Sequence, residues 1–169
     1  SSFSAIGGIP TGLVFSNDGT KMYITNNTGD DIDQYSLSTA FDVSTASYDS
    51  VTLVISSQTT SPSDLVFNND GTKLYLIGDS TVFQYTLSTA FDLSTASYDS
   101  VSFSVSTQAP AASGIDFNAD GTKMYVVGQQ YDQVREYNLS TAWNISTASY
   151  SQGFSVSSQD TAPTAVSFK

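Results

Sequence analysis

The chain has 169 residues, of which 12% are aromatic and 12% charged, and it contains neither Cys nor His. The absence of these two residue types excludes thiol nucleophiles, histidine bases and most zinc, copper and haem sites. A net charge of −11, from 16 acidic and 5 basic residues, disfavours nucleic acid and anionic membrane surfaces as partners. No apolar run approaches membrane-spanning length, so membrane insertion is not expected.

A repeat of about 50 residues runs through the sequence. An Asp-Gly-Thr-Lys segment begins at Asp18, Asp70 and Asp120, at intervals of 52 and 50 residues. A Leu-Ser-Thr-Ala block occurs once in each copy. Self-similarity at a fixed period indicates a repeat architecture, and the coils of a β-solenoid would have a shorter period.

Each copy resolves into four short strands, as the first copy illustrates. Residues 13–15 are apolar and end at Asn-Asp-Gly, which favours a tight hairpin because these residues tolerate positive φ. Residues 21–25 form the expected second strand, and a hairpin of variable length follows. Residues 32–37 and 49–55 alternate apolar and polar side chains, as half-buried strands do.

Four antiparallel strands per repeat, without helical periodicity, predict an all-β chain made of the four-stranded antiparallel blades of a β-propeller. We expect a single propeller segment over residues 1–169. About three complete blades are expected within it, at approximately 11–56, 63–106 and 113–157.

Two orphan strands are expected at the ends of this segment. Residues 2–6 match a fourth strand without its blade, and residues 164–168 match a first strand with nothing after it. Since a ring needs about four to eight blades, this partial ring would leave strand edges unpaired. We therefore expect it to join further copies or further blades of the same protein.

The first hairpin of each copy resembles that of known propeller repeats. Residues 13–24 and 65–76 show an apolar, Asp-Gly, Lys, apolar-Tyr pattern similar to that of the YVTN, NHL and TolB-like families. With its Ser-Thr-Ala-Phe-Asp linker, the unit is also similar to repeats of marine bacterial surface proteins and of phage tail or fibre proteins. The resemblance implies a propeller fold, but propellers host lectins, scaffolds, receptors and hydrolases alike.

Variation between the copies is concentrated at one end of the expected ring, in the second hairpin and the links between blades. Rigid scaffolds usually carry function on loops, so this end is the predicted recognition surface, although unconstrained loops also drift. The candidate binding residues are Asp30, Asp31, Asp79, Gln129, Tyr131 and Asp132.

An acidic cluster at Asp30, Asp31 and Asp33 could offer carboxylate oxygens to Ca²⁺. It lacks the spacing of a calcium loop and is not repeated in the second copy. A solvated turn is the favoured interpretation, and no metal or other cofactor is expected.

Aromatic residues occupy one linker position in every copy, at Phe41, Phe91 and Trp143. A sugar-stacking platform is conceivable for Trp143. Because the same position holds Phe twice, we expect a plug that packs against the edge of a blade.

Two charges depart from the repeat in the third copy. Asp116 takes the place of Val14 and Val66, and Arg135 takes the place of Asp33 and Phe83. A charge in the strand nearest the axis needs a partner. We expect Asp116 to face the central channel or a blade interface, where Arg135 or water compensates it.

Three Asn residues, Asn26, Asn138 and Asn144, fit the N-glycosylation acceptor pattern. Chance matches are common in a sequence so rich in Ser and Thr, and Asn138 lies inside an expected strand. Asn26 and Asn144 are therefore retained as candidate acceptors without a prediction that they are glycosylated.

The low share of charged residues, the Ser/Thr-rich composition and the lack of a catalytic constellation favour a non-enzymatic module with a structural or recognition role. We expect it at the extracellular face of a cell or on a virion, acting through its loops and its assembly, with a surface protein or a glycan as partner.

Two alternatives stay open. A glycan-binding, lectin-like propeller would carry one pocket per blade, lined by Trp or Tyr with Asp or Asn. A metal-dependent hydrolase or lactonase would need inward Glu, Asp, Asn or His from several first strands, and only Asp116 is evident.

Overall fold

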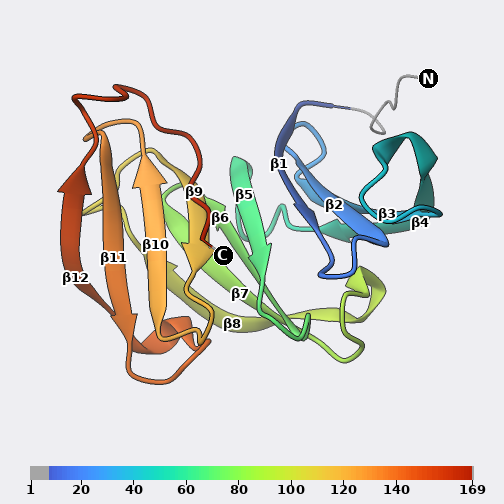
Figure 1. The fold of residues 1–169 in the computed structure, drawn as a ribbon. Helices are drawn as coiled ribbons and strands as arrows, with labels where there is room; N and C mark the ends of the chain where they lie inside the picture. Colours follow the sequence, from blue (N-terminus) through green and yellow to red (C-terminus); the bar gives the residue numbers. More distant parts are fainter. Residues whose placement is uncertain (1–7, 169) are drawn as a thin grey trace.

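The computed structural model describes residues 8–168, so the orphan strand expected at residues 2–6 lies outside them. Within the described part, twelve strands form three separate four-stranded antiparallel sheets, each in simple sequence order (Figure 1). We call each sheet with its linker a blade. The helices of this part are three-residue turns, and none of them is long and apolar enough to cross a membrane.

The first blade comprises β1 (Pro10–Phe15), β2 (Lys21–Asn26), β3 (Asp31–Leu37) and β4 (Ala46–Val54). The second comprises β5 (Pro62–Phe67), β6 (Lys73–Gly78), β7 (Thr81–Leu87) and β8 (Ala96–Ser104). The third comprises β9 (Ala112–Phe117), β10 (Lys123–Gly128), β11 (Gln133–Leu139) and β12 (Ala148–Ser155). A 3₁₀ turn precedes the last strand of each blade, at η1 (Val43–Thr45), η2 (Leu93–Thr95) and η3 (Ile145–Thr147).

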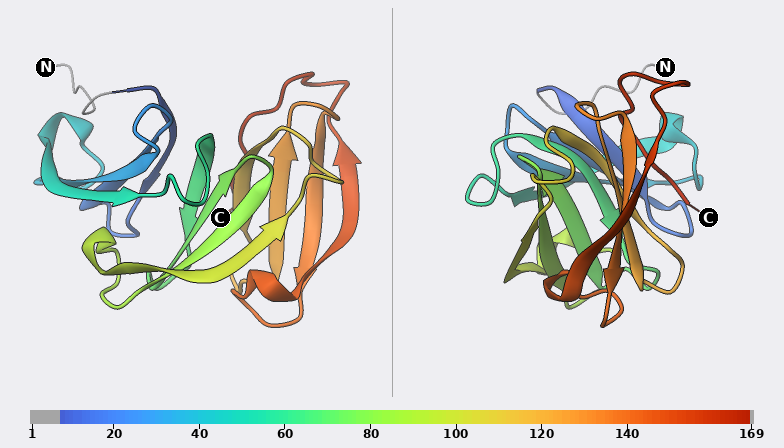
Figure 2. Two further views of the ribbon diagram at one scale, coloured as in Figure 1. Left: turned by 180° about the vertical axis from the view of Figure 1, so that it is seen from behind. Right: turned by 90° about the vertical axis from the view of Figure 1, so that its left-hand side faces the viewer.

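The three sheets follow one another along an open arc (Figures 1 and 2). The first strands lie side by side on its inner edge, where β5 contacts both β1 and β9. One face of each sheet, which we call upstream, turns toward the preceding blade, and the downstream face turns toward the next. Residues 164–168 were expected to form a strand, but they belong to no sheet, since no other strand of their blade lies among the described residues.

The Asp-Gly turn shapes the first hairpin of each blade. Gly19 has a φ of +70°, in the left-handed region that favours glycine. A Cβ added at Gly19 would lie 2.4 Å from the ring of Phe41, so the linker aromatic covers this glycine. Gly71 and Gly121 repeat the arrangement with their own linker aromatics.

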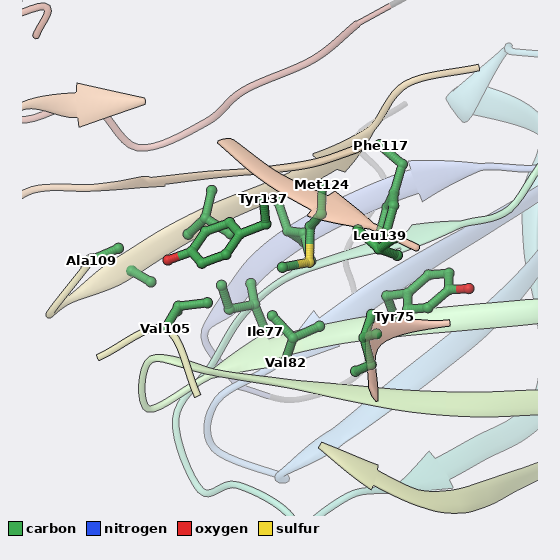
Figure 3. Close-up of a cluster of buried hydrophobic side chains, with 13 residues drawn as sticks. Tyr75, Ile77, Val82, Val105, Ala109, Phe117, Met124, Tyr137 and Leu139 are labelled. Atoms are coloured by element: carbon green, nitrogen blue, oxygen red, sulfur yellow. The ribbon is translucent and has the colours of Figure 1, made fainter. Parts of the chain in front are cut away.

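Most of the hydrophobic core lies between the sheets (Figure 3), and a smaller buried cluster lies within blade 1 at Met22, Ile24, Tyr35 and Leu37. At the junction of blades 2 and 3, Ile77 and Val82 of the second sheet meet Met124, Tyr137 and other residues of the third. All four of these side chains are at most 1% exposed. Because burial of apolar surface is the main stabilising term, a blade that left these side chains in water would lose stability, so each blade depends on its neighbour.

Two of the three linker aromatics, Phe91 and Trp143, behave as plugs, as the sequence predicts, whereas Phe41 is 59% exposed. The ring of Trp143 lies 5.3 Å from that of Phe117 and 6.2 Å from that of Tyr75 in the preceding blade. Phe91 packs against Phe67 at 5.3 Å. These rings close the end of the junction that carries the Asp-Gly turns.

Polar bonds to the linker backbone fix the spacing of the blades. The Tyr23 hydroxyl donates to the Phe91 carbonyl at 2.5 Å, and the amide of Leu93 donates to the buried side chain of Gln34 at 2.9 Å. At the next junction, Tyr75 and Gln84 make the same bonds to the linker of blade 3 at 2.6 and 3.1 Å. The two junctions therefore share one pattern, with a Tyr hydroxyl bonded to a linker carbonyl and a linker amide bonded to a Gln side chain.

Tyr75→Phe removes one hydroxyl and leaves the Trp143 carbonyl without its partner across the junction. We expect the free energy of unfolding, measured by urea denaturation, to fall by about 1 kcal/mol. Tyr131→Phe, on an exposed hairpin, is the matched control and should change it by less than about 0.5 kcal/mol. Equal losses in both variants would contradict the role given to the junction bond.

Candidate active site

The hairpin residues proposed as a binding face serve first as turn residues. Asp30, Asp79 and Asp132 all have φ near +50°. The carbonyl of Asp30 accepts the amide of Ile55 at 2.9 Å, and the side chain of Asp79 accepts the Thr59 hydroxyl at 2.7 Å. These aspartates lie on three different blades, so the structure gathers them into no single site.

The acidic turn of blade 1 also has a local role. Burial, with the negative charges of Asp33 and Asp30 nearby, raises the pKa of Asp31. Asp33 is buried and accepts the Thr52 hydroxyl at 2.6 Å. Across residues 8–168, no three His, Cys, Asp or Glu side chains gather in a way that could hold a metal ion.

Arg135 does not compensate Asp116, and that part of our expectation was wrong. Asp116 is the cross-strand neighbour of Tyr125 and Arg135 that of Val126, so they point to opposite faces of the sheet. The Arg135 guanidinium lies 5.6 Å from the ring of Tyr131, which is 47% exposed. The neighbouring Gln129 is exposed on the same hairpin.

The two glycosylation candidates are engaged in turns. Asn26 is only 6% exposed, and its side-chain oxygen accepts the amide of Thr28 at 3.0 Å. Asn144 accepts the amide of Ser146 at 3.1 Å and begins the 3₁₀ turn of blade 3. Burial of Asn26 disfavours attachment of a glycan to the folded chain.

A groove of about 560 Å³ lies between blades 1 and 2, at the end with the Asp-Gly turns. Asp18, Lys21, Asp49 and Asp92 are among its lining residues. Hydrogen bonds from the Thr20 amide, and then from neighbouring hydroxyls, hold the pKa of Asp18 below its usual range. Lys21 of β2 and Asp49 of β4 form an ion pair at 2.9 Å within blade 1.

A different pair of carboxylates lies on the inner edge of the arc. Asp64 is in β5 and Asp116 in β9, the first strands of neighbouring blades. The two oxygens of Asp64 accept the amide of Leu65 at 2.9 Å and that of Ile115 at 3.1 Å. Asp64 therefore ties its own strand to the first strand of the next blade.

Asp116 repeats this arrangement one blade further on. It accepts the amide of Phe117 at 2.7 Å and, through its other oxygen, that of Phe168 at 2.6 Å. Amides along the edge of a first strand would otherwise be unpaired at the channel. Each carboxylate thus satisfies the edge of the strand that follows it.

Asp64 also contacts the first blade. A Cβ added to Gly12 would lie 2.8 Å from the Cα of Asp64 and 3.1 Å from its carboxylate. Only a residue without a side chain fits at Gly12 beside this aspartate. Asp64 is consequently the point at which the first strands of all three blades meet.

The environment of Asp64 raises the pKa of its carboxyl group toward neutral pH. Burial raises the pKa of Asp64 to about 6; the amides of Ile115 and Leu65 oppose this rise, and the charge of Asp116 adds to it. Burial also raises the pKa of Asp116, against the bonds from Phe168 and Phe117. A carboxyl group that titrates near pH 6 can take up and return a proton at physiological pH, as a general base must.

Asp64 was not recognised from the sequence. It stands where the other copies have Gly12 and Gly114, so the departure from the repeat is visible. An aspartate in a strand with Ser, Leu and Val carries no motif, and its bond to the Ile115 amide depends on how the blades pack.

Solved structures show what this fold resembles. A protein from Bacteroides uniformis, provisionally named a 6-phosphogluconolactonase, matches with a TM-score of 0.63 and 17% identity, over 85% of this chain and 40% of its own. The periplasmic gluconolactonase of Pseudomonas aeruginosa matches with 0.60 and 16%, over 89% and 40%. The Cps50 β-propeller domain from Myceliophteria thermophila matches with 0.52 and 12%, over 88% and 43%.

The class of fold follows from these likenesses and the three sheets: the chain is a segment of a β-propeller with three four-stranded blades, which confirms the predicted fold. It spans about 40% of the length of the first two of these neighbours. No protein-family model and no curated protein matches the sequence.

The neighbours correct our functional prediction. We expected a non-enzymatic structural or recognition module, whereas several solved propellers of this shape are named lactonases. The exclusion of an enzyme was therefore wrong. It rested on the lack of a catalytic constellation, and the carboxylate pair at Asp64 and Asp116 removes that ground.

The coupling of the two carboxylates predicts a change in titration. Asp116→Asn removes a negative charge beside Asp64, so the midpoint of the Asp64 carboxyl resonance, followed by NMR, should fall below about pH 6. Because the folded pKa of Asp64 is raised, its contribution to stability decreases as pH rises from about 4 to about 6. An unchanged midpoint would show that the two groups act independently.

Proposed function

We propose that these three blades belong to a propeller that hydrolyses lactones, with Asp64 as the general base. The observation that carries the proposal is the Asp64 carboxyl group, placed where three first strands meet and titrating near pH 6. The names of the structural neighbours support the reaction class. Their identities of 16–17% leave the activity of this chain to be tested.

Lactone hydrolysis requires a base that accepts a proton from water and then donates it to the leaving oxygen. The ionised Asp64 accepts a proton from water as the water oxygen bonds to the carbonyl carbon of the lactone. The tetrahedral oxyanion then collapses, the ring C–O bond breaks, and the leaving alkoxide takes the proton back from Asp64. The product is an open-chain hydroxy acid, and the enzyme is restored without a redox partner. Asp116 does not react; its charge raises the proton affinity of Asp64.

The charge distribution favours an uncharged lactone over a phosphorylated one. Two carboxylates line the described inner edge, and the chain carries a net charge of −11. Lys21, Lys73 and Lys123 are each paired with an acidic side chain. A phosphate would meet repulsion at this edge, whereas a neutral sugar lactone would not.

Two further proposals concern the family of the repeat and the location of the protein. We propose that the repeat belongs with the YVTN, NHL and TolB-like hairpins, because the Asp-Gly turn and its following Lys and Tyr hold the same structural places in all three blades. We also propose an extracellular, cell-surface or virion-surface location, which the sparsely charged, Ser/Thr-rich composition supports.

Asp64→Asn should lower kcat for hydrolysis of glucono-δ-lactone by about 10²- to 10⁴-fold, measured by pH-stat after subtraction of spontaneous opening. In the unaltered protein, kcat/KM should rise with pH and level off above about pH 6, since the base must be ionised.

Asp92→Asn is the matched control. Asn144 fills the corresponding turn of blade 3, so asparagine is tolerated there and the rate should not change. Full activity of the Asp64→Asn variant, or an unaltered protein that does not accelerate ring opening, would refute the proposal.

A further inference from the structure

The downstream face of blade 3 has the makeup of a junction face but lacks a covering sheet among the described residues. Phe154 is 71% exposed, whereas its counterparts Leu53 and Phe103 are partly buried against the next blade. Tyr125 is half-buried where Tyr23 and Tyr75 are fully buried. A hollow of about 190 Å³ is lined by Tyr125, Val134, Glu136, Gln152, Gly153 and Phe154.

Residues 164–168 already lie on this face, although they belong to no sheet. A Cβ added to Gly114 would lie 2.9 Å from the Cα of Ala165, which repeats the 2.8 Å between Gly12 and Asp64. The ring of Phe168 lies 4.1 Å from that of Tyr125. The two existing junctions have the same ring pair, at 4.7 and 4.5 Å. Residues 164–168 thus occupy the place that β5 and β9 hold in their own blades.

Two residue differences concern the position in blade 3 that would accept a linker amide from a following blade. In blade 1, Gln34 donates to Asp49 at 2.8 Å, while its oxygen accepts the linker amide of the next blade. Blade 3 has Glu136 in place of Gln34 and Ser151 in place of Asp49. The acidic group has moved from the fourth strand to the third.

Glu136 occupies the position of Gln34 and also forms the ion pair that Asp49 forms in blade 1. Its Oε1 pairs with Lys123 at 2.8 Å, as Asp49 pairs with Lys21 in blade 1. Its Oε2 accepts a long bond of 3.4 Å from Gln152, and the Ser151 hydroxyl also donates to this carboxylate. This second oxygen lies on the face where Gln34 accepts an amide from its neighbour.

We propose that a fourth blade of the same repeat docks on this face, with residues 164–168 as its first strand. Its linker amide donates to Glu136, and its linker aromatic presents a carbonyl to the Tyr125 hydroxyl. The occupant is a blade of this repeat because each of these contacts has two counterparts in the molecule and its first strand is in place. The inference does not depend on lactone hydrolysis.

The test compares the 169-residue chain with the same chain extended after Phe168 by its own residues 68–106, which supply the three further strands. We expect the extension to raise Tm by at least about 5 °C. Hydrogen exchange at the amides of β12 should also slow several-fold, because Phe154 and the last sheet become covered.

Variants at Glu136 identify the contact. Glu136→Ala should remove most of the gain in Tm in the extended chain and cost the unextended chain only its bonds within blade 3, chiefly the Lys123 pair. The double variant Glu136→Gln with Ser151→Asp recreates the arrangement of blades 1 and 2, so it should restore the gain.

Three results would overturn the inference. The first is unchanged Tm and β12 exchange on extension, and the second is an equal loss from Glu136→Ala in both chains. The third is self-association of the unextended chain that is abolished by Leu13→Asp but is not prevented by the extension. This result would assign the face to blade 1 of a second copy.

Discussion

The packing of one sheet against the next is the interaction on which the rest of the structure depends. Most of the buried side chains of the described part gather at the junctions between blades, and blade 1 also holds a small cluster of its own. Burial supplies the stabilisation, while Tyr-to-carbonyl and Gln-to-amide bonds set the spacing and tilt of each sheet. That spacing brings β1, β5 and β9 side by side, which no single blade could achieve.

The carboxylates of the inner edge follow from this packing. Asp64 and Asp116 each accept two backbone amides: one from their own strand, and one from Ile115 in the next blade or from Phe168, respectively. The same burial that makes these bonds useful for joining strands shifts the protonation of Asp64 toward neutrality. Asp64 therefore both joins the first strands and serves as the proposed base. A substitution of Asp64 that alters the reaction also alters the contact between blades.

Features that depend on local sequence could be predicted, and features that depend on register between blades could not. The Asp-Gly turns, the four strands and the linker plugs at Phe91 and Trp143 repeat in the sequence and form locally. The face of Arg135 follows only from the alignment of β10 with β11, and the partner of Asp116 only from residues about 50 positions away. Asp64 gave no signal beyond its replacement of a glycine.

The most direct test of the account is a crystal structure of the protein with an unreactive lactam analogue of the lactone. The account predicts that the analogue binds at the inner edge of the first strands, with a water bridging the Asp64 carboxylate and the carbonyl carbon. Binding in the groove beside Asp18 and Asp92, or at the hairpin end of the blades, would contradict it.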